Sequence, residues 1–148
     1  MSRETDFKTV MQADATLMSV LTGGVYTVDT IGRDGISRDT APAAFDSDGY
    51  LKPCALVKQR GQVPDNQVVD KSIASASQVV EIWLYQDSGY TAIDSAVSRI
   101  FLLFNWHQFS NSFPLEWAGT INRERDSGSL NGASLARIDW LVAAIEGA

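Results

Sequence analysis

The side chains that most often carry catalysis are scarce in this sequence. The chain has one histidine, His107, and one cysteine, Cys54. A Ser-His-Asp hydrolase would have to use His107 as its base, but no Gly-x-Ser-x-Gly motif presents a nucleophilic serine. His107 stands beside Trp106 and near Phe109 just past a predicted helix, so we interpret it as a structural or surface histidine. A nucleophilic thiolate needs a neighbouring base, so we interpret Cys54 as a small buried side chain in a strand.

The sequence also lacks the usual motifs for metal and phosphate. Asp46 and Asp48, followed by Gly49, resemble the start of a calcium loop, but the ligand that closes such a loop is missing. The double glycine at 23–24 is not followed by the Lys-Ser/Thr of a phosphate-binding loop. A single cysteine excludes an intrachain disulfide and argues against a cysteine-based zinc site. We therefore expect no catalytic residues, cofactor or metal, and rank a hydrolase using His107 or a carboxylate pair lowest.

Composition favours one soluble domain. The 148 residues are 45% hydrophobic and 20% charged, which suits a globular protein with its own core. The net charge of −6 argues against a surface that grips DNA, although an acidic wall could let DNA pass without holding it. No run of 18 apolar residues indicates a membrane span, and the polar start, MSRETDFK, is unlike a signal peptide. We expect a protein made in a reducing compartment.

Two helices are predicted from apolar residues at helical spacing. The first spans about 4–21, is interrupted on its apolar side by Asp14, and is ended by Gly23 and Gly24. The second opens with Ser88 as a plausible cap and ends near residue 105. The predicted buried stripes are Phe7, Val10, Met11, Met18 and Leu21 in the first helix, and Ile93, Val97, Ile100, Phe101 and Phe104 in the second, broadened by Leu102 and Leu103.

Five segments are predicted as strands. They are a short one at 25–28, then 50–59 with Pro53 near its start, 77–87, 114–126 and 133–145. Alternation is clearest in the third and the last, where one side of each strand is apolar. The two apolar sides are Val80, Ile82 and Leu84, and Ala136, Ile138, Trp140 and Val142; the opposite sides are Val79, Glu81, Trp83 and Tyr85, and Leu135, Arg137, Asp139 and Leu141.

The stretch 29–49 is the least regular part, rich in Asp, Gly, Ser and Thr. We predict a long loop, with a β-hairpin at IGRDGI as one option. Two interpretations stay open: a mobile surface excursion, or an arm ordered against a neighbouring subunit. The segments 60–67 and 68–76 are predicted as a turn and a second connection.

The order of these elements predicts the fold class. It shows neither the strict alternation of strands and helices that a doubly wound sheet requires nor an internal repeat. We expect an α+β fold in a single domain, 1–148: one mostly antiparallel β-sheet with two helices packed on it.

Several segments together resemble the tail terminator (tail-completion, minor tail protein U-like) proteins of long-tailed bacteriophages. They are ADATLMSVLTGGVY, the Pro-led KPCALVKQ, QVVEIWLYQD before the helix YTAIDSAVSRIFLLF, and the closing ARIDWLVAAI. The likeness covers nearly the whole chain by order of elements. The link at 29–49 is longer here than is usual in that family.

The resemblance implies a structural virion protein. It implies a ring-forming subunit, in a homohexamer at the head-proximal end of the tail tube, that stops tube polymerisation and joins the tail to the neck or head. The implied partners are copies of the same chain, the tail tube protein and a neck or head-completion protein, with DNA passing through the lumen without specific binding. Such a protein is made in the host cytoplasm and resides in the virion. The alternatives are a neck ring protein and a small cellular α+β adaptor module.

Candidate subunit-interface residues follow from what a ring requires. A head-to-tail contact needs two different complementary surfaces, and aromatic and arginine side chains are favoured at interface centres. We predict one surface at Trp83 and Tyr85 and another at the edge near Trp117. Arg123 and Arg125, in the mixed-charge run NRERD, are predicted to pair with carboxylates across a subunit boundary. The alternative is that these aromatic side chains lie under a helix or under the long loop.

Overall fold

One sheet organises the chain, and most of its neighbouring strands are antiparallel. The computed structural model describes residues 3–61, 63–64, 73–110, 112–128, 130 and 132–147. The strand order is β1-β2-β4-β6-β5, and β3 pairs with β4 off this path. The strands are β1 (Val25–Thr27), β2 (Cys54–Gln59), β3 (Val63–Pro64), β4 (Ile73–Gln86), β5 (Glu116–Arg125) and β6 (Ser134–Gly147).

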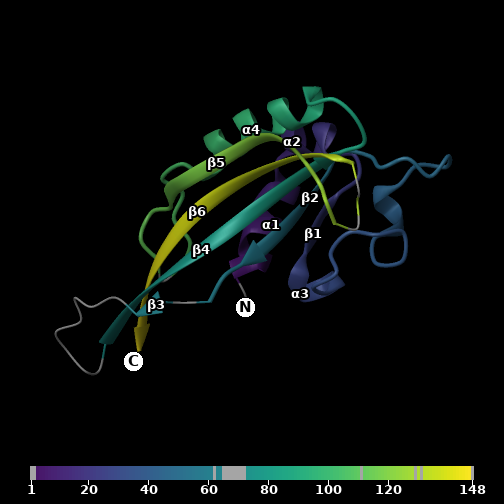
Figure 1. Ribbon diagram of the computed structural model, residues 1–148. Coiled ribbons are helices and arrows are strands. Elements are labelled where there is room, and N and C mark those ends of the chain that lie inside the picture. The colour runs from purple at the N-terminus through teal and green to yellow at the C-terminus, as the bar shows by residue number, and fades with distance from the viewer. Residues whose placement is uncertain are drawn as a thin grey trace.

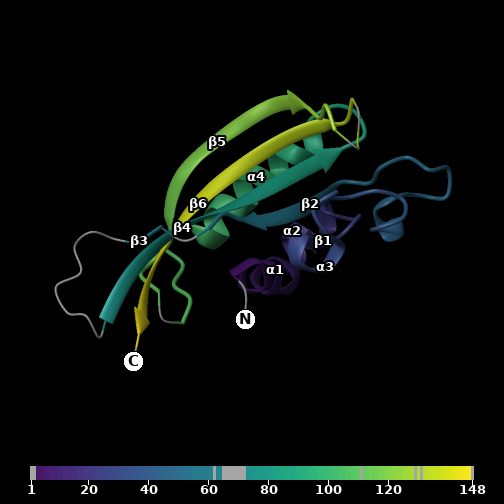
Figure 2. The same ribbon diagram turned by 60° about the horizontal axis from the view of Figure 1, so that its bottom comes forward.

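The pairing confirms the predicted α+β fold with a mostly antiparallel sheet. Among the described strands, β1 and β2 pair in parallel, while the β2–β4, β4–β6 and β6–β5 pairs are antiparallel. β4 and β6 pair along 14 residues, from Ile73 opposite Gly147 to Gln86 opposite Ser134. This ribbon continues past the helices to the end of the molecule where the C-terminus lies (Figures 1 and 2).

Helices cover one face of the sheet. They are α1 (Arg3–Ala13), α2 (Ala15–Val20) and α4 (Thr91–Phe104); two short ones, α3 (Val28–Ile31) and the 3-10 helix η1 (Pro42–Ala44), lie in the connection between β1 and β2. The core beneath them is aromatic: the Phe7 and Phe104 rings stack with centroids 4.7 Å apart, and Trp140 packs against Phe104. As predicted, Val80, Ile82 and Leu84 and Ala136, Ile138, Trp140 and Val142 belong to this core.

The predicted single N-terminal helix is two helices, broken at Asp14. The Asp14 carboxylate accepts a hydrogen bond from the Leu17 backbone N–H at 2.9 Å and so caps the start of α2. Arg99 of α4 donates to both carboxylate oxygens, at 2.8 and 2.7 Å. The interruption of the apolar stripe by Asp14 is therefore a helix start tied to another helix.

The glycine pair at 23–24 links α2 to β1 for two different reasons. Gly24 has φ of +96°, which suits glycine. Gly23 donates its N–H to the Pro53 carbonyl at 2.8 Å, and a Cβ at Gly23 would lie 2.9 Å from that same oxygen. The pair thus brings the start of β1 directly against the chain that leads into β2.

The predicted start of the second helix was wrong. The helix begins at Thr91, after Tyr90, and Ser88 does not cap it. Instead the Gln86 side-chain oxygen accepts hydrogen bonds from the Ala92 and Ile93 N–H groups. Leu102 is 74% exposed, so it does not broaden the buried stripe.

The strand boundaries also differ from the prediction. β4 begins at Ile73 instead of residue 77, because it pairs with the C-terminal part of β6, and β6 runs on to Gly147. The remainder of the predicted connection at 68–76, residues 68–72, lies outside the described residues, as does half of the predicted turn at 60–67, namely residues 62 and 65–67. β5 carries two irregularities, between Trp117 and Gly119 and between Ile121 and Glu124.

The long segment 29–49 packs against the sheet of the same chain. It contains α3 and η1 and no hairpin at 31–36. Ile36 and Ala44 are buried against Leu56 and Tyr85 on the face that the helices leave free. The Glu4 carboxylate accepts hydrogen bonds from the backbone N–H groups of Asp29 and Gln59, so it ties α1 to the start of this segment and to the end of β2. The base of the segment is therefore part of the folded protomer.

Candidate interaction surfaces

The sheet face opposite the helices is only partly covered. The 29–49 segment covers the half around Leu56 and Tyr85, and leaves a second half that we call the open face. The open face is formed by outward side chains of β2, β4, β6 and β5: Lys58, Glu81, Trp83, Ile121, Arg137 and Asp139.

A charge network holds the open face together. Arg60 Nε donates to Glu81 Oε2 at 2.8 Å, and the Trp83 indole N–H donates to Glu81 Oε1 at 3.0 Å. Arg137 Nε lies 3.0 Å from Asp139 Oδ1. The hydrogen bond and charge of Glu81 raise the pKa of the Arg60 guanidinium. These four charges balance one another, which explains how Glu81 is nearly buried on a face without a covering layer.

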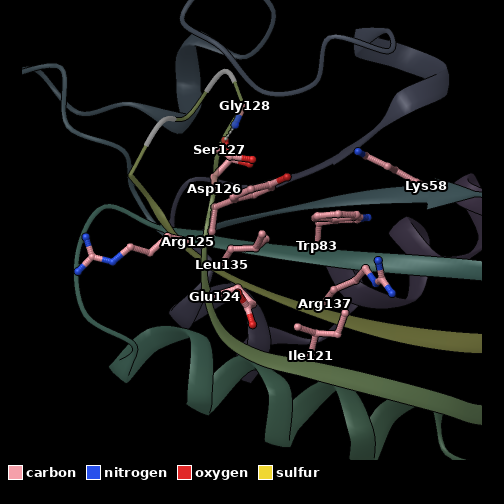
Figure 3. Close-up of a pocket in the computed structure, with 11 residues that line it drawn as sticks. Lys58, Trp83, Ile121, Glu124, Arg125, Asp126, Ser127, Gly128, Leu135 and Arg137 are labelled. Carbon is pink, nitrogen blue, oxygen red and sulfur yellow. Dashed lines mark hydrogen bonds between the residues drawn. The ribbon is translucent and has the colours of Figure 1, made fainter.

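Trp83 lines a pocket on the open face (Figure 3). Lys58 Nζ lies 4.4 Å and Arg137 Cζ 5.4 Å from its ring centroid, so two cations flank one indole. The hollow has a volume of about 520 Å³ and is also lined by Ile121, Leu135 and the 124–128 turn. We call it the open-face pocket.

The second surface lies where α4 ends and the edge strand β5 begins. Six large hydrophobic residues are exposed in the described part of the chain, and four of them lie on the end of α4, the loop after it or the start of β5: Leu102 (74%), Trp106 (68%), Phe113 (50%) and Trp117 (51%). Trp117 meets the Phe101 ring edge-on at 5.6 Å, and its indole N–H donates to the Thr120 hydroxyl. We call this the β5-edge surface. Clustered exposed apolar side chains of this size mark contact sites in soluble proteins.

The structure divides the predicted interface residues between these two surfaces. Trp83 and Arg125 line the open-face pocket, whereas Trp117 lies on the β5-edge surface. Arg123, also on β5, pairs with Asp94 of α4 at 2.8 Å and lies over the Tyr90 ring. Tyr85 is 6% exposed, since it lies beneath the 29–49 segment as the alternative interpretation held. Tyr85 also lines the open-face pocket, but because so little of it is exposed it is left out of the contact proposed below.

Three features of these surfaces were missed by the sequence reasoning. Lys58 and Arg137 were not predicted beside Trp83; strand register brings them there. The 45–51 tip, closed by a bridge between Phe45 and Leu51, exposes Tyr50 to 61%. The only sequence signal for it was an aromatic residue after an Asp- and Gly-rich run.

The residues considered for chemistry have structural roles. Burial raises the pKa of the Cys54 thiol to about 12. The His107 ring contacts Phe104 and Phe109 edge-on. The Asp46 carboxylate accepts from the backbone N–H groups of Asp48 and Tyr50, which accounts for the resemblance to a calcium loop. Among the described residues, no group of three or more His, Cys, Asp and Glu could hold a metal, and no helix could span a membrane.

Comparison with known proteins gives a fold likeness only. No family model and no curated protein matches the chain. One solved structure with a similar fold is a chain of the "virion of native gene transfer agent (GTA) particle". The similarity covers 97% of this chain and 94% of that chain, with a TM-score of 0.62 and 13% sequence identity. The two chains therefore share their architecture along almost their whole length.

Proposed function

We propose that this chain is a structural protein of a phage-like virion, and specifically the tail terminator. The observation that carries the proposal is the fold shared along 97% of the chain with a component of a gene transfer agent virion. The sequence resemblance to tail terminators leads independently to the same class of protein. In the proposed role, copies of the chain form a ring, hexameric in the family, at the head-proximal end of the tail tube.

The two surfaces have properties that suit this role. A subunit at the end of a tube must contact its ring neighbours and also the tube or the neck, so it needs more than one interface. The open face and the β5-edge surface are separate; the first carries Trp83 with Arg125 and Arg137, and the second carries Trp106 and Trp117, side-chain types that interface centres favour. Six chains of charge −6 would carry −36 in total, which suits a passage that DNA crosses without binding.

The experiment measures assembly and its effect on the tail tube. The purified chain is analysed by light scattering and by electron microscopy, alone and with polymerising tail tube protein. We expect rings, and tubes that stop growing at the end to which a ring is bound. A chain that stays monomeric even beside tube protein would contradict the proposal.

A neck ring protein is the second candidate, because such a protein also forms a ring within the virion. Only position separates the two. Gold-labelled antibody against the chain should mark isolated tails at their head-proximal end if the chain is the terminator. Label found only on tail-free heads would favour the neck protein instead. If the chain is a small cellular adaptor, the antibody should label neither tails nor heads.

A further inference from the structure

The 45–51 tip is a rigid projection that exposes binding groups. The connection between α3 and β2 extends beyond the end of the sheet in both views (Figures 1 and 2). Asp46 accepts hydrogen bonds from Asp48 and Tyr50, and Gly49 donates to the Asp46 carbonyl. Arg38 adds a hydrogen bond to the Gly49 carbonyl at 2.9 Å. A segment ordered in advance loses little entropy when it binds a partner.

Two side chains of this tip, Asp48 and Tyr50, are turned to solvent. Tyr50 is 61% exposed, and Asp48 is exposed with a carboxylate that accepts no hydrogen bond from the part of the chain that the structure describes. The tip thus offers one aromatic ring and one carboxylate on a fixed backbone. A tyrosine presented this way supplies a large contact area at a low cost in conformational entropy.

The open-face pocket has the complementary chemistry. Its lining carries three cations, Lys58, Arg125 and Arg137, against the carboxylates of Glu124 and Asp126, in a chain of net charge −6. Asp126 is already used by the backbone N–H groups of Gly128 and Leu130. In Figure 3 the Glu124 carboxylate and the Arg125 guanidinium both point away from Lys58 and Trp83. Since Arg137 is paired with Asp139, the part of the pocket around Trp83 is aromatic and carries the positive charge of Lys58.

We infer that the 45–51 tip of one copy inserts into the open-face pocket of the next copy. Tyr50 packs on Trp83 and Ile121, and Asp48 pairs with Lys58. The volume of about 520 Å³ lies in the range of pockets that enclose a substantial ligand, so one tyrosine with its flanking residues fits. Tip and pocket are different surfaces, so the contact is head-to-tail and closes a ring at the correct rotation. This inference rests on the proposed ring-forming function and names the contact that makes the ring.

Two variants break the contact from opposite sides. Tip variant Asp48→Lys/Tyr50→Ala and pocket variant Lys58→Glu should each weaken self-association at least about tenfold, measured by light scattering against concentration. The matched control is Asp39→Lys, the same charge change at another exposed position of the connection. Circular dichroism and thermal melting confirm that each variant is folded. The control should assemble like the wild type.

Mixing the two broken variants gives the decisive result. For this mixture the tip variant is Asp48→Ala/Tyr50→Ala, whose tip has no charge that could pair with the Lys58→Glu pocket. A tip-variant copy keeps its pocket and a pocket-variant copy keeps its tip, so one intact contact remains per pair. We expect 1:1 dimers from the mixture and no rings. A double charge swap, with Asp48→Lys and Lys58→Glu in the same chain, should restore assembly.

The outcomes separate this inference from the proposed function. Rings that survive in both variants overturn the tip-and-pocket contact and leave the proposed function standing. A mixture that stays monomeric, or a charge swap without rescue, also overturns the contact. A wild-type chain that does not assemble with or without tube protein overturns both.

Discussion

The two faces of the sheet are built on different principles. The helix-covered face is apolar and sealed, with Trp140, Phe7 and Phe104 fully buried. The opposite face is only half sealed, by the 29–49 segment, and its remainder is a balanced set of charges around Trp83. The side chains that bury the first face all come from the same chain. The second leaves an aromatic and cationic hollow that a partner can fill, so stability and assembly should respond to different substitutions.

Paired tryptophans on the helix-covered face test how far its sealed core extends towards the β5 edge. Trp140 of β6 and Trp117 of β5 are direct partners in the sheet register, yet one is 0% and the other 51% exposed. Trp140→Ala should lower the free energy of unfolding by about 3–5 kcal/mol, since it opens a cavity against Phe101 and Phe104. Trp117→Ala should cost about 1 kcal/mol or less. Urea unfolding followed by circular dichroism measures both.

The matched control for the core substitution is Trp140→Phe. Trp140 Nε1 is buried and has no hydrogen-bond partner among the described residues, so its loss removes no bond. The cost should therefore fall well below that of Trp140→Ala. Equal costs for Trp140→Ala and Trp117→Ala would contradict the division of the helix-covered face into a sealed centre and an exposed β5 edge.

The covered half of the second face should behave as core. Ile36 is 1% exposed and packs in the cluster with Leu56 and Tyr85. Ile36→Ala should destabilise by about 2–4 kcal/mol. Ile121→Ala, the same change at a 42% exposed position of the open face, should cost about 1 kcal/mol or less. If the two costs coincide, the 29–49 segment is a loose excursion and not a layer of the fold.

Asp14 supplies a smaller, pH-dependent part of the stability of the helix side. The hydrogen bond from Arg99, with that from the Leu17 N–H, holds the pKa of Asp14 at about 2 instead of 3.8. Because the folded-state pKa is lowered, this stabilisation is complete above about pH 4 and disappears as the pH falls towards 2. Asn can still cap a helix, so Asp14→Asn isolates the ion pair and should cost about 1 kcal/mol at pH 7.

Urea unfolding at several pH values between 7 and 2 measures this effect. The wild type should lose stability relative to Asp14→Asn over pH 4 to 2, and the two should converge at the acidic end. Asp39→Asn, at an exposed position, serves as the control and should follow the wild-type profile. A constant difference between Asp14→Asn and wild type at every pH would show that the pair with Arg99 contributes no titrating stabilisation.

The sequence predicted what is local and periodic. Alternation in 80–84 and 136–142 correctly gave the buried side of β4 and β6, since every second side chain of a strand faces the core. The same logic failed at Leu102, because an apolar residue in a helix looks identical whether it faces its own core or a partner. The interruption at Asp14 was visible, but its meaning depends on Arg99, 85 residues away.

The candidate site was predictable only in part for the same reason. Trp83 and Trp117 were selected by residue type, and the structure keeps both accessible. The flanking of Trp83 by Lys58 and Arg137 arises from the register of β2, β4 and β6, which a single sequence does not reveal. The burial of Tyr85 likewise depends on where the 29–49 segment folds back.

Cys54 gives the mildest test, one that leaves the fold untouched. It lies under the covered half of the second face with 0% exposure, and burial raises the pKa of its thiol to about 12. At pH 8 Ellman's reagent should therefore react with the native chain at least about a hundredfold more slowly than with the chain in guanidinium. Adding an exposed thiol by Ser88→Cys should yield one fast-reacting equivalent and serves as the control. Rapid labelling of native Cys54 would mean that the 29–49 segment opens readily. The covered half of this face would then be as accessible to solvent as the open half.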